Sequence, residues 1–247
     1  MEVVVEQCKT ARIRMGSQQG SIMTESLNFK KLTELAKDLP GSAGKLNAAI
    51  DRITAIPKDR SLEDLAAIYG SIARGRALMS QALAWKSPHV GKESKSAVVR
   101  GCQWRLVMAM AGFEIIVKGL FQSSRKLKPA HINRIADIGN GADIAPLKPP
   151  KIPPKQVEKW LKDKSVFRFL DVNEFDEGVL QSWLIERKEI GGLADQLNLI
   201  RTLRNCTVHA ALSAHKCKQF GLKPALDHLP ETVAKVWLSI LLVLCSE

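Results

Sequence analysis

The feature that most constrains the fold is a long, proline-free stretch over residues 93–127. In the middle of this predicted helix apolar residues cover nearly the whole circumference, which is typical of a helix enclosed by other parts of a protein. Glu114 is the only acid in that middle. A buried carboxylate needs a hydrogen-bond donor or a cation beside it, and we expect an arginine from another helix to provide it.

Further helices are predicted on both sides of this stretch. Ser61, followed by two acids, is the predicted N-cap of a helix that reaches about residue 85. Almost no strand pattern remains, so we expect an all-α fold, a helical bundle with long core helices. The other predicted helices cover residues 27–39, 42–56, 132–138, 157–162, 175–188 and 193–220, and a last one opened by Pro230.

Changes in composition and proline-rich or glycine-rich stretches divide the chain into three predicted parts. Residues 1–25 have the composition of a flexible tail. Residues 26–90 form a predicted N-terminal helical segment without catalytic spacing, and residues 91–247 form the main helical domain. Within that domain, residues 139–155 are a proline-rich, basic loop.

Composition restricts the class of protein and its partners. Hydrophobic residues make up 45% of the 247, as in ordinary globular proteins. The net charge of +12 gives the surface a positive potential that attracts nucleic acid, nucleotides or an anionic membrane, and the alternative is a basic surface that only confers solubility. Five cysteines, an odd number without a C-x-x-C pair, indicate a reducing, cytoplasmic location. The longest apolar runs fall short of the roughly 20 residues that span a bilayer, so no membrane partner is expected.

One arginine in the predicted helix 193–220 conflicts with its amphipathic pattern. One face, which includes Val208, is apolar. The opposite face carries a polar stripe in which Asn205 and His209 are one turn apart. The members of this stripe are Asn198, Thr202, Asn205, His209, Ser213 and Lys216. Arg204 points into the apolar face, about 140° from His209. It therefore requires a buried acid such as Glu114, a position at the edge of a dimer interface, or a kink in the helix.

The run Arg204-Asn205-Cys206-Thr207-Val208-His209 resembles the R-x(4–6)-H motif, often written R-N-x-x-x-H, of the HEPN superfamily. Members of that superfamily are helical bundles, and many are metal-independent ribonucleases. The resemblance covers six residues and the all-helical context.

This resemblance implies an endoribonuclease without a cofactor or metal ion. His209 would be the general acid/base, Arg204 a clamp on the scissile phosphate, and Asn205 a positioning group. Glu114 would support the site, and Arg201 and Lys216 would bind substrate. RNA is the implied partner, in a homodimer whose two motifs line one cleft. A toxin or antiviral effector is the implied biological class, with a protein regulator or antitoxin as a further partner.

Other interpretations of the same residues remain open. Arg204 could be a structural ion-pair partner and His209 a solvated surface residue, in a non-catalytic helical module that binds nucleic acid or protein. Cys206, His209, His215 and Cys217 are zinc-ligand types. On a regular helix Cys206 and His209 could share a face, but His215 and Cys217 lie about 200° apart and diverge. The five tryptophans lie in apolar helical contexts, which favours core packing over base stacking.

Overall fold

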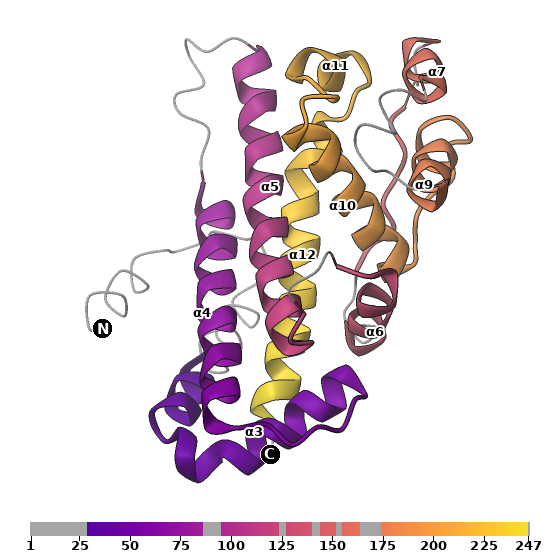
Figure 1. Cartoon of the computed structure of the whole chain (residues 1–247). Helices are drawn as coiled ribbons and strands as arrows, with labels where there is room; N and C mark the ends of the chain where they lie inside the picture. The colour runs from indigo at the N-terminus through magenta and orange to yellow at the C-terminus, as the bar shows by residue number, and fades with distance from the viewer. Residues whose placement is uncertain are drawn as a thin grey trace.

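A computed structural model describes residues 29–85, 95–123, 127–139, 144–151, 155–163 and 174–246. These residues confirm the all-α prediction, and the isolated bridge between Leu147 and Ile190 is the β-type pairing found among them. Residues 29–37 are helical. The helices that follow, labelled as in Figure 1, are α3 (Leu39–Thr54), α4 (Leu62–Ala84), α5 (Lys95–Leu120), α6 (Pro129–Gly139), α7 (Lys155–Lys162), α9 (Glu174–Leu184), α10 (Leu193–Val208), α11 (Ala214–Gln219) and α12 (Lys223–Cys245).

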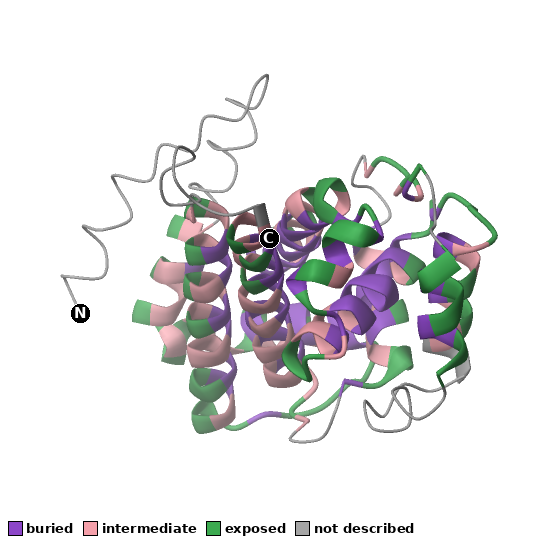
Figure 2. Ribbon diagram, turned by 90° about the horizontal axis from the view of Figure 1, so that it is seen from above, coloured by how far each residue is buried: buried purple, intermediate pink, exposed green. Residues whose placement is uncertain are grey.

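Helix α5 is the centre of the bundle, as its apolar middle predicts. It packs against α4, α10, α11 and α12, and its side chains Leu106, Met110 and Phe113 are fully buried. Figure 2 shows that buried residues lie on the inward faces of the surrounding helices.

The antiparallel pair α4 and α5 is joined through small residues. Gly75 of α4 and Gly112 of α5 lie so close that a Cβ on either would clash with the carbonyl oxygen of the other. Further along, a Cβ on Gly119 of α5 would clash with the side chain of Ser71 of α4. The absence of side chains at these points lets the two backbones approach, which explains why α4 has the most extensive contact with α5.

Helix α12 crosses the core beside α5. Within the described residues it is the one helix long and apolar enough to cross a membrane by length and composition. Its side chains Val233, Val236 and Trp237 are buried in the bundle, so α12 is packed as a core helix of this fold.

One predicted boundary is confirmed and three are corrected. Ser61 caps α4 in a capping box with Asp64. The core helix ends earlier than predicted, at Leu120, because Gln122 adopts a left-handed φ of 46°. The last helix does not open at Pro230: it begins at Lys223, with another proline in its first turn, and Pro230 lies inside it. The predicted helix over residues 193–220 is two helices, described with the site.

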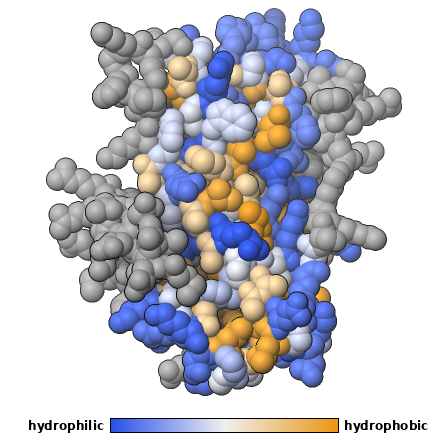
Figure 3. Space-filling view, turned by 60° about the vertical axis from the view of Figure 1, so that its left-hand side comes forward, coloured by the Kyte–Doolittle hydropathy of each residue, from blue (hydrophilic) through white to orange (hydrophobic). Residues whose placement is uncertain are grey.

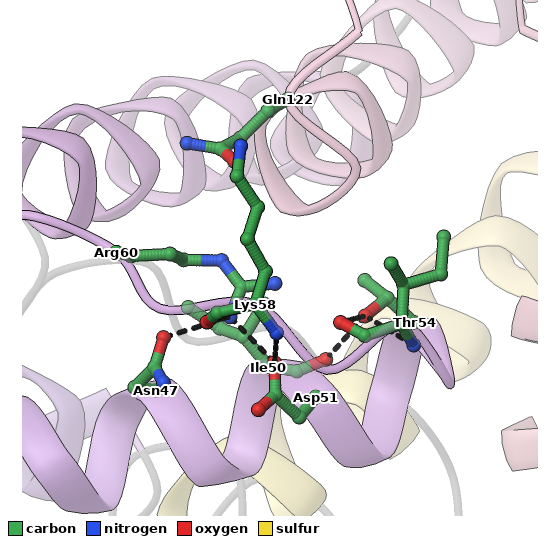
Figure 4. A network of polar contacts seen from close by, with 8 residues as sticks. Asn47, Ile50, Asp51, Thr54, Lys58, Arg60 and Gln122 are labelled. Carbon is green, nitrogen blue, oxygen red and sulfur yellow. Dashed lines mark hydrogen bonds and ion pairs between the residues drawn. The ribbon is translucent and has the colours of Figure 1, made fainter.

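The link between α3 and α4 is fixed by a buried arginine (Figure 4). Arg60 Nη1 donates to Oδ1 of Asn47 (2.7 Å), to Oδ1 of Asp51 (2.6 Å) and to the backbone oxygen of Lys58 (3.1 Å). Lys58 Nζ donates to Oε1 of Gln122 (2.6 Å), just beyond the end of α5. This network ties the N-terminal helices to the central helix.

The buried side chains of the N-terminal and C-terminal parts belong to one continuous core. It includes Leu46 and Ile50 of α3, Ile72 of α4, and Ile240 of α12. The predicted division near residue 90 stays a prediction. The predicted tail lies outside the described residues.

Candidate functional site

The run from Arg204 to His209 lies at the C-terminal end of α10 rather than in the middle of a long helix. Helix α10 ends at Val208, and His209 is its C-cap. Ala210 then takes a left-handed φ of 58°, which turns the chain away. The prediction of one helix over 193–220 is therefore wrong.

The short helix α11, which follows the turn, starts directly after Ser213, and Ser213 caps it. Ser213 Oγ accepts a hydrogen bond from the backbone N–H of Lys216 (3.2 Å) at the start of α11. Serine is favoured at an N-cap over a helix interior, so this residue stabilises the break. Consequently Ser213 and Lys216 do not continue the predicted stripe of Asn205 and His209.

A buried glutamine of α5 holds the turn between α10 and α11. Gln103 Nε2 donates to the backbone oxygen of Leu212 (2.6 Å) and to Oγ1 of Thr207 (3.3 Å). The side chain of Gln103 is buried, so these hydrogen bonds compensate its loss of water. The segment that carries His209 is thus anchored to the central helix.

Arg204 is paired with Glu114, as the sequence predicts for a buried acid and an arginine from another helix. Arg204 Nη2 donates to Oε1 of Glu114, and each side chain is 19% exposed. Burial lowers the pKa of Arg204 from its usual value, but a guanidinium stays charged in proteins. Nε of Arg204 is buried without a hydrogen-bond partner among the described residues. One N–H donor of the Arg204 guanidinium therefore remains without a hydrogen bond beside the ion pair.

The polar stripe predicted on α10 is only partly a surface. Asn198 and Thr202 are fully buried, and Thr202 Oγ1 donates to the backbone oxygen of Asn198 (2.9 Å). Val208, predicted on the apolar face, is exposed. The stripe fails because α10 packs against α5, α6 and α9 and so has little free circumference. Of the stripe, Asn205 is half-buried and His209 is exposed.

The two predicted substrate-binding cations lie on different helices. Arg201 is half-buried on α10, one turn before Arg204. Lys216 is on α11, and its Nζ donates to the backbone oxygen of Ala211 (3.3 Å), so it folds back over the turn. The structure thus brings Arg204 to Glu114, and Lys216 to the turn that follows His209.

Sequence reasoning missed a concentration of positive charge around this turn. Residues 196–226 contain no aspartate or glutamate. They span the greater part of α10, all of α11 and the start of α12, which gather at one end of the bundle (Figure 1). The sequence did contain a signal for this concentration of charge, namely the absence of acidic residues over this long segment. The basic residues of the segment are Arg201, Arg204, His209, His215, Lys216, Lys218 and Lys223.

The zinc interpretation finds no support. Cys206 and Cys217 are buried in the core, whereas His209 and His215 are exposed. Burial raises the pKa of Cys217 to about 12, which opposes the thiolate that zinc requires. Within the described part of the chain, no cluster of three or more His, Cys, Asp or Glu side chains could hold a metal ion.

One tryptophan departs from the predicted core packing. Trp104 of α5 is 54% exposed, whereas Trp160, Trp183 and Trp237 are buried and Trp85 is half-buried. The apolar residues around Trp104 in the sequence concealed this difference, because α5 is buried on most but not all of its circumference.

Comparison of the chain with protein-family models, with curated proteins and with solved structures finds no match. The resemblance to the HEPN superfamily stays a prediction that depends on Arg204, Asn205 and His209. Function therefore has to be inferred from the residues of the site.

Proposed function

We propose that the chain is a metal-independent endoribonuclease whose site lies at the C-terminal end of α10. The observation that carries the proposal is the position of His209, exposed at this helix end within an acid-free basic segment, close in sequence to an arginine fixed by Glu114. Phosphate groups of RNA are attracted to such a segment. In the proposed site Asn205 positions the substrate, and Arg201 and Lys216 contact its backbone.

The proposed reaction is attack of a ribose 2′-hydroxyl on the adjacent phosphorus. The new P–O2′ bond forms as the P–O5′ bond breaks, which leaves a 2′,3′-cyclic phosphate and a 5′-hydroxyl. His209 is suited to move the proton, since histidine exchanges protons readily near neutral pH. Arg204 keeps guanidinium donors beyond the one bound to Glu114, and these match phosphate oxygens.

A homodimer belongs to this proposal. Pairing of two protomers around the motif would place two copies of His209 and Arg204 at one cleft. Such a pairing would also bring the partly exposed Arg204–Glu114 pair to a protomer boundary. A toxin or antiviral role in the cytoplasm, held in check by a protein regulator, is the biological setting that the resemblance suggests.

The ion pair itself favours a second candidate, a non-catalytic helical module that binds nucleic acid or protein. Arg204 and Glu114 join α10 to α5, a structural task that needs no substrate. In such a module the basic segment would bind its ligand and His209 would be a surface residue.

Cleavage of an unstructured RNA in the presence of a chelator separates the two candidates. We expect the parent protein to cleave and His209→Ala to lower the rate by about 10²- to 10⁴-fold, the usual contribution of a general acid/base. His215→Ala is the matched control, because His215 is also exposed and lies in the same basic segment. The product should carry a 2′,3′-cyclic phosphate.

Two results would contradict the nuclease. Equal cleavage by the parent protein and His209→Ala would remove His209 from the chemistry. RNA binding by a parent protein that leaves the RNA intact would establish the second candidate instead. A thermal melt of each variant verifies that its fold is retained.

A further inference from the structure

An exposed tryptophan on the central helix is the starting point. Trp104 leaves more than half of its side chain in water, although α5 lies at the centre of the bundle and packs against α4, α10, α11 and α12. A large aromatic group in water is energetically unfavourable, and tryptophan is enriched at binding interfaces. Figure 3, seen from the α4 side, shows that apolar side chains reach the surface among hydrophilic ones on that side of the bundle.

Trp104 lies at the level of the candidate site. Its neighbour Gln103 donates to Leu212 and Thr207 in the turn between α10 and α11, so this part of α5 is adjacent to the turn that carries His209. Arg100, four residues before Trp104, is exposed on the same face of α5. An aromatic ring and a cation are therefore presented together beside the turn.

Basic residues predominate beside Trp104. Residues 96–113 of α5 contain no aspartate or glutamate, and neither do residues 196–226. The nearby acids Asp227 and Glu231 of α12 are engaged by cations: Lys223 Nζ donates to Oδ2 of Asp227 (2.5 Å), and Arg105 Nη2 lies 3.9 Å from Oε1 of Glu231. A partner here must supply negative charge together with flat apolar groups. A second copy docked symmetrically on Trp104 itself would bring two copies of Arg100 together, so the proposed pairing of protomers around Arg204 and His209 is expected to leave the face of Trp104 free. Single-stranded RNA supplies both phosphates and exposed base faces, whereas a duplex hides its base faces in the stack.

We propose that Trp104 is a stacking platform for an unpaired base of single-stranded RNA, with Arg100 contacting the phosphate backbone beside it. This assignment rests on the proposed nucleic-acid function but not on cleavage. It makes unpaired RNA the substrate class and places the strand along α5 toward the turn at His209.

The test measures binding separately from cleavage. The probe is a fluorescent single-stranded oligonucleotide of about 12 nucleotides, within the usual site size for such proteins. Its 2′-hydroxyls are methylated, so that the proposed 2′-attack cannot occur. We expect Trp104→Ala to weaken binding roughly 5- to 150-fold at fixed salt, the range measured when one stacked base loses its aromatic partner. Trp104→Phe should restore most of the affinity, and a duplex of the same length should be affected less than about twofold.

Leu242→Ala is the matched control. Leu242 is a similarly exposed apolar residue, but it lies near the C-terminal end of α12, at the opposite end of the bundle from the turn at His209 (Figure 1). Its removal should leave the affinity for RNA unchanged.

Three results would overturn the assignment. The first is a parent protein that does not bind the single strand. The second is an equal loss of single-strand and duplex binding in Trp104→Ala. The third is that the parent protein sediments as a dimer and Trp104→Ala as a monomer, which would make this face an interface between two copies of the chain. Retained binding with no cleavage of ordinary RNA would refute the nuclease alone and leave the stacking platform in place.

Discussion

At the scale of the residue, Arg204 has two possible tasks, and the ion pair with Glu114 makes them separable. A buried ion pair loses hydration on both sides, so its net contribution to stability can be small. Removing one partner is more harmful, because the remaining charge stays without compensation. Both side chains here retain some contact with water, which moderates the loss.

We expect Glu114→Gln to lower the free energy of unfolding by about 1–3 kcal/mol, below the 3–5 kcal/mol of fully buried pairs. Urea denaturation followed by circular dichroism measures this. The double variant Glu114→Gln/Arg204→Met should regain much of the loss, since no uncompensated charge remains.

The double variant also distinguishes structure from chemistry. If Arg204 clamps phosphate, the double variant should be folded but unable to cleave RNA. If Glu114→Gln alone were as stable as the parent protein, the ion pair between Arg204 and Glu114 would have no structural role.

At the scale of the element, the close approach of α4 and α5 is the most demanding contact of the fold. Gly75 and Gly112 face each other without space for a side chain, so α5 depends on glycine at a helical position where glycine is intrinsically unfavourable. The tight packing must outweigh that intrinsic loss.

Gly112→Ala should therefore destabilise the protein by about 1–3 kcal/mol, the usual effect of overpacking a core. Gly44→Ala is the control, because Gly44 lies inside α3 with open space where its Cβ would be. That variant should be neutral or more stable by up to about 1 kcal/mol, as expected for alanine in a helix. Comparable thermal melts for the two variants would disprove the tight contact.

The elements also show what sequence patterns can and cannot predict. The cap at Ser61 and the enclosed middle of α5 depend on local chemistry and composition, and both were predictable. The pairing of Glu114 was predictable because a lone buried acid needs a cation. The break after Val208 was not, since helical spacing continues through the turn and the hydrogen bonds of Gln103 come from a distant part of the chain.

Exposure was the least predictable property. Trp104 is exposed to water although its side chain is largely apolar, and Asn198 is buried in the core although its side chain is polar. Burial of a side chain depends on which helices pack around it, and the sequence of a single helix does not contain that information. Trp104 lies beside the candidate site, where departures from simple patterning are expected.

At the scale of the whole molecule, the N-terminal helices and the C-terminal part share one core. Helix α4 buries Leu65, Ile68, Ile72 and Met79, and it has its most extensive contact with α5. Arg60 fixes the α3–α4 connection to Asp51 of α3, and Lys58 adds a polar link from this connection to Gln122 at the end of α5. The bundle is thus closed on one side by the N-terminal segment.

A chain that begins at residue 91 therefore should not fold as the full protein does. Without α4, the face of α5 that includes Gly112 and Ile116 would lie in water, and the apolar contact that stabilises the central helix would be lost. We expect retained far-UV but weak near-UV circular dichroism, together with binding of a hydrophobic dye, the signs of a loosely packed state. A cooperative thermal transition in the shortened chain would instead establish residues 91–247 as an independent domain. In that case α4 would be a cover for α5, and its removal would expose the helix that carries Glu114 and Trp104.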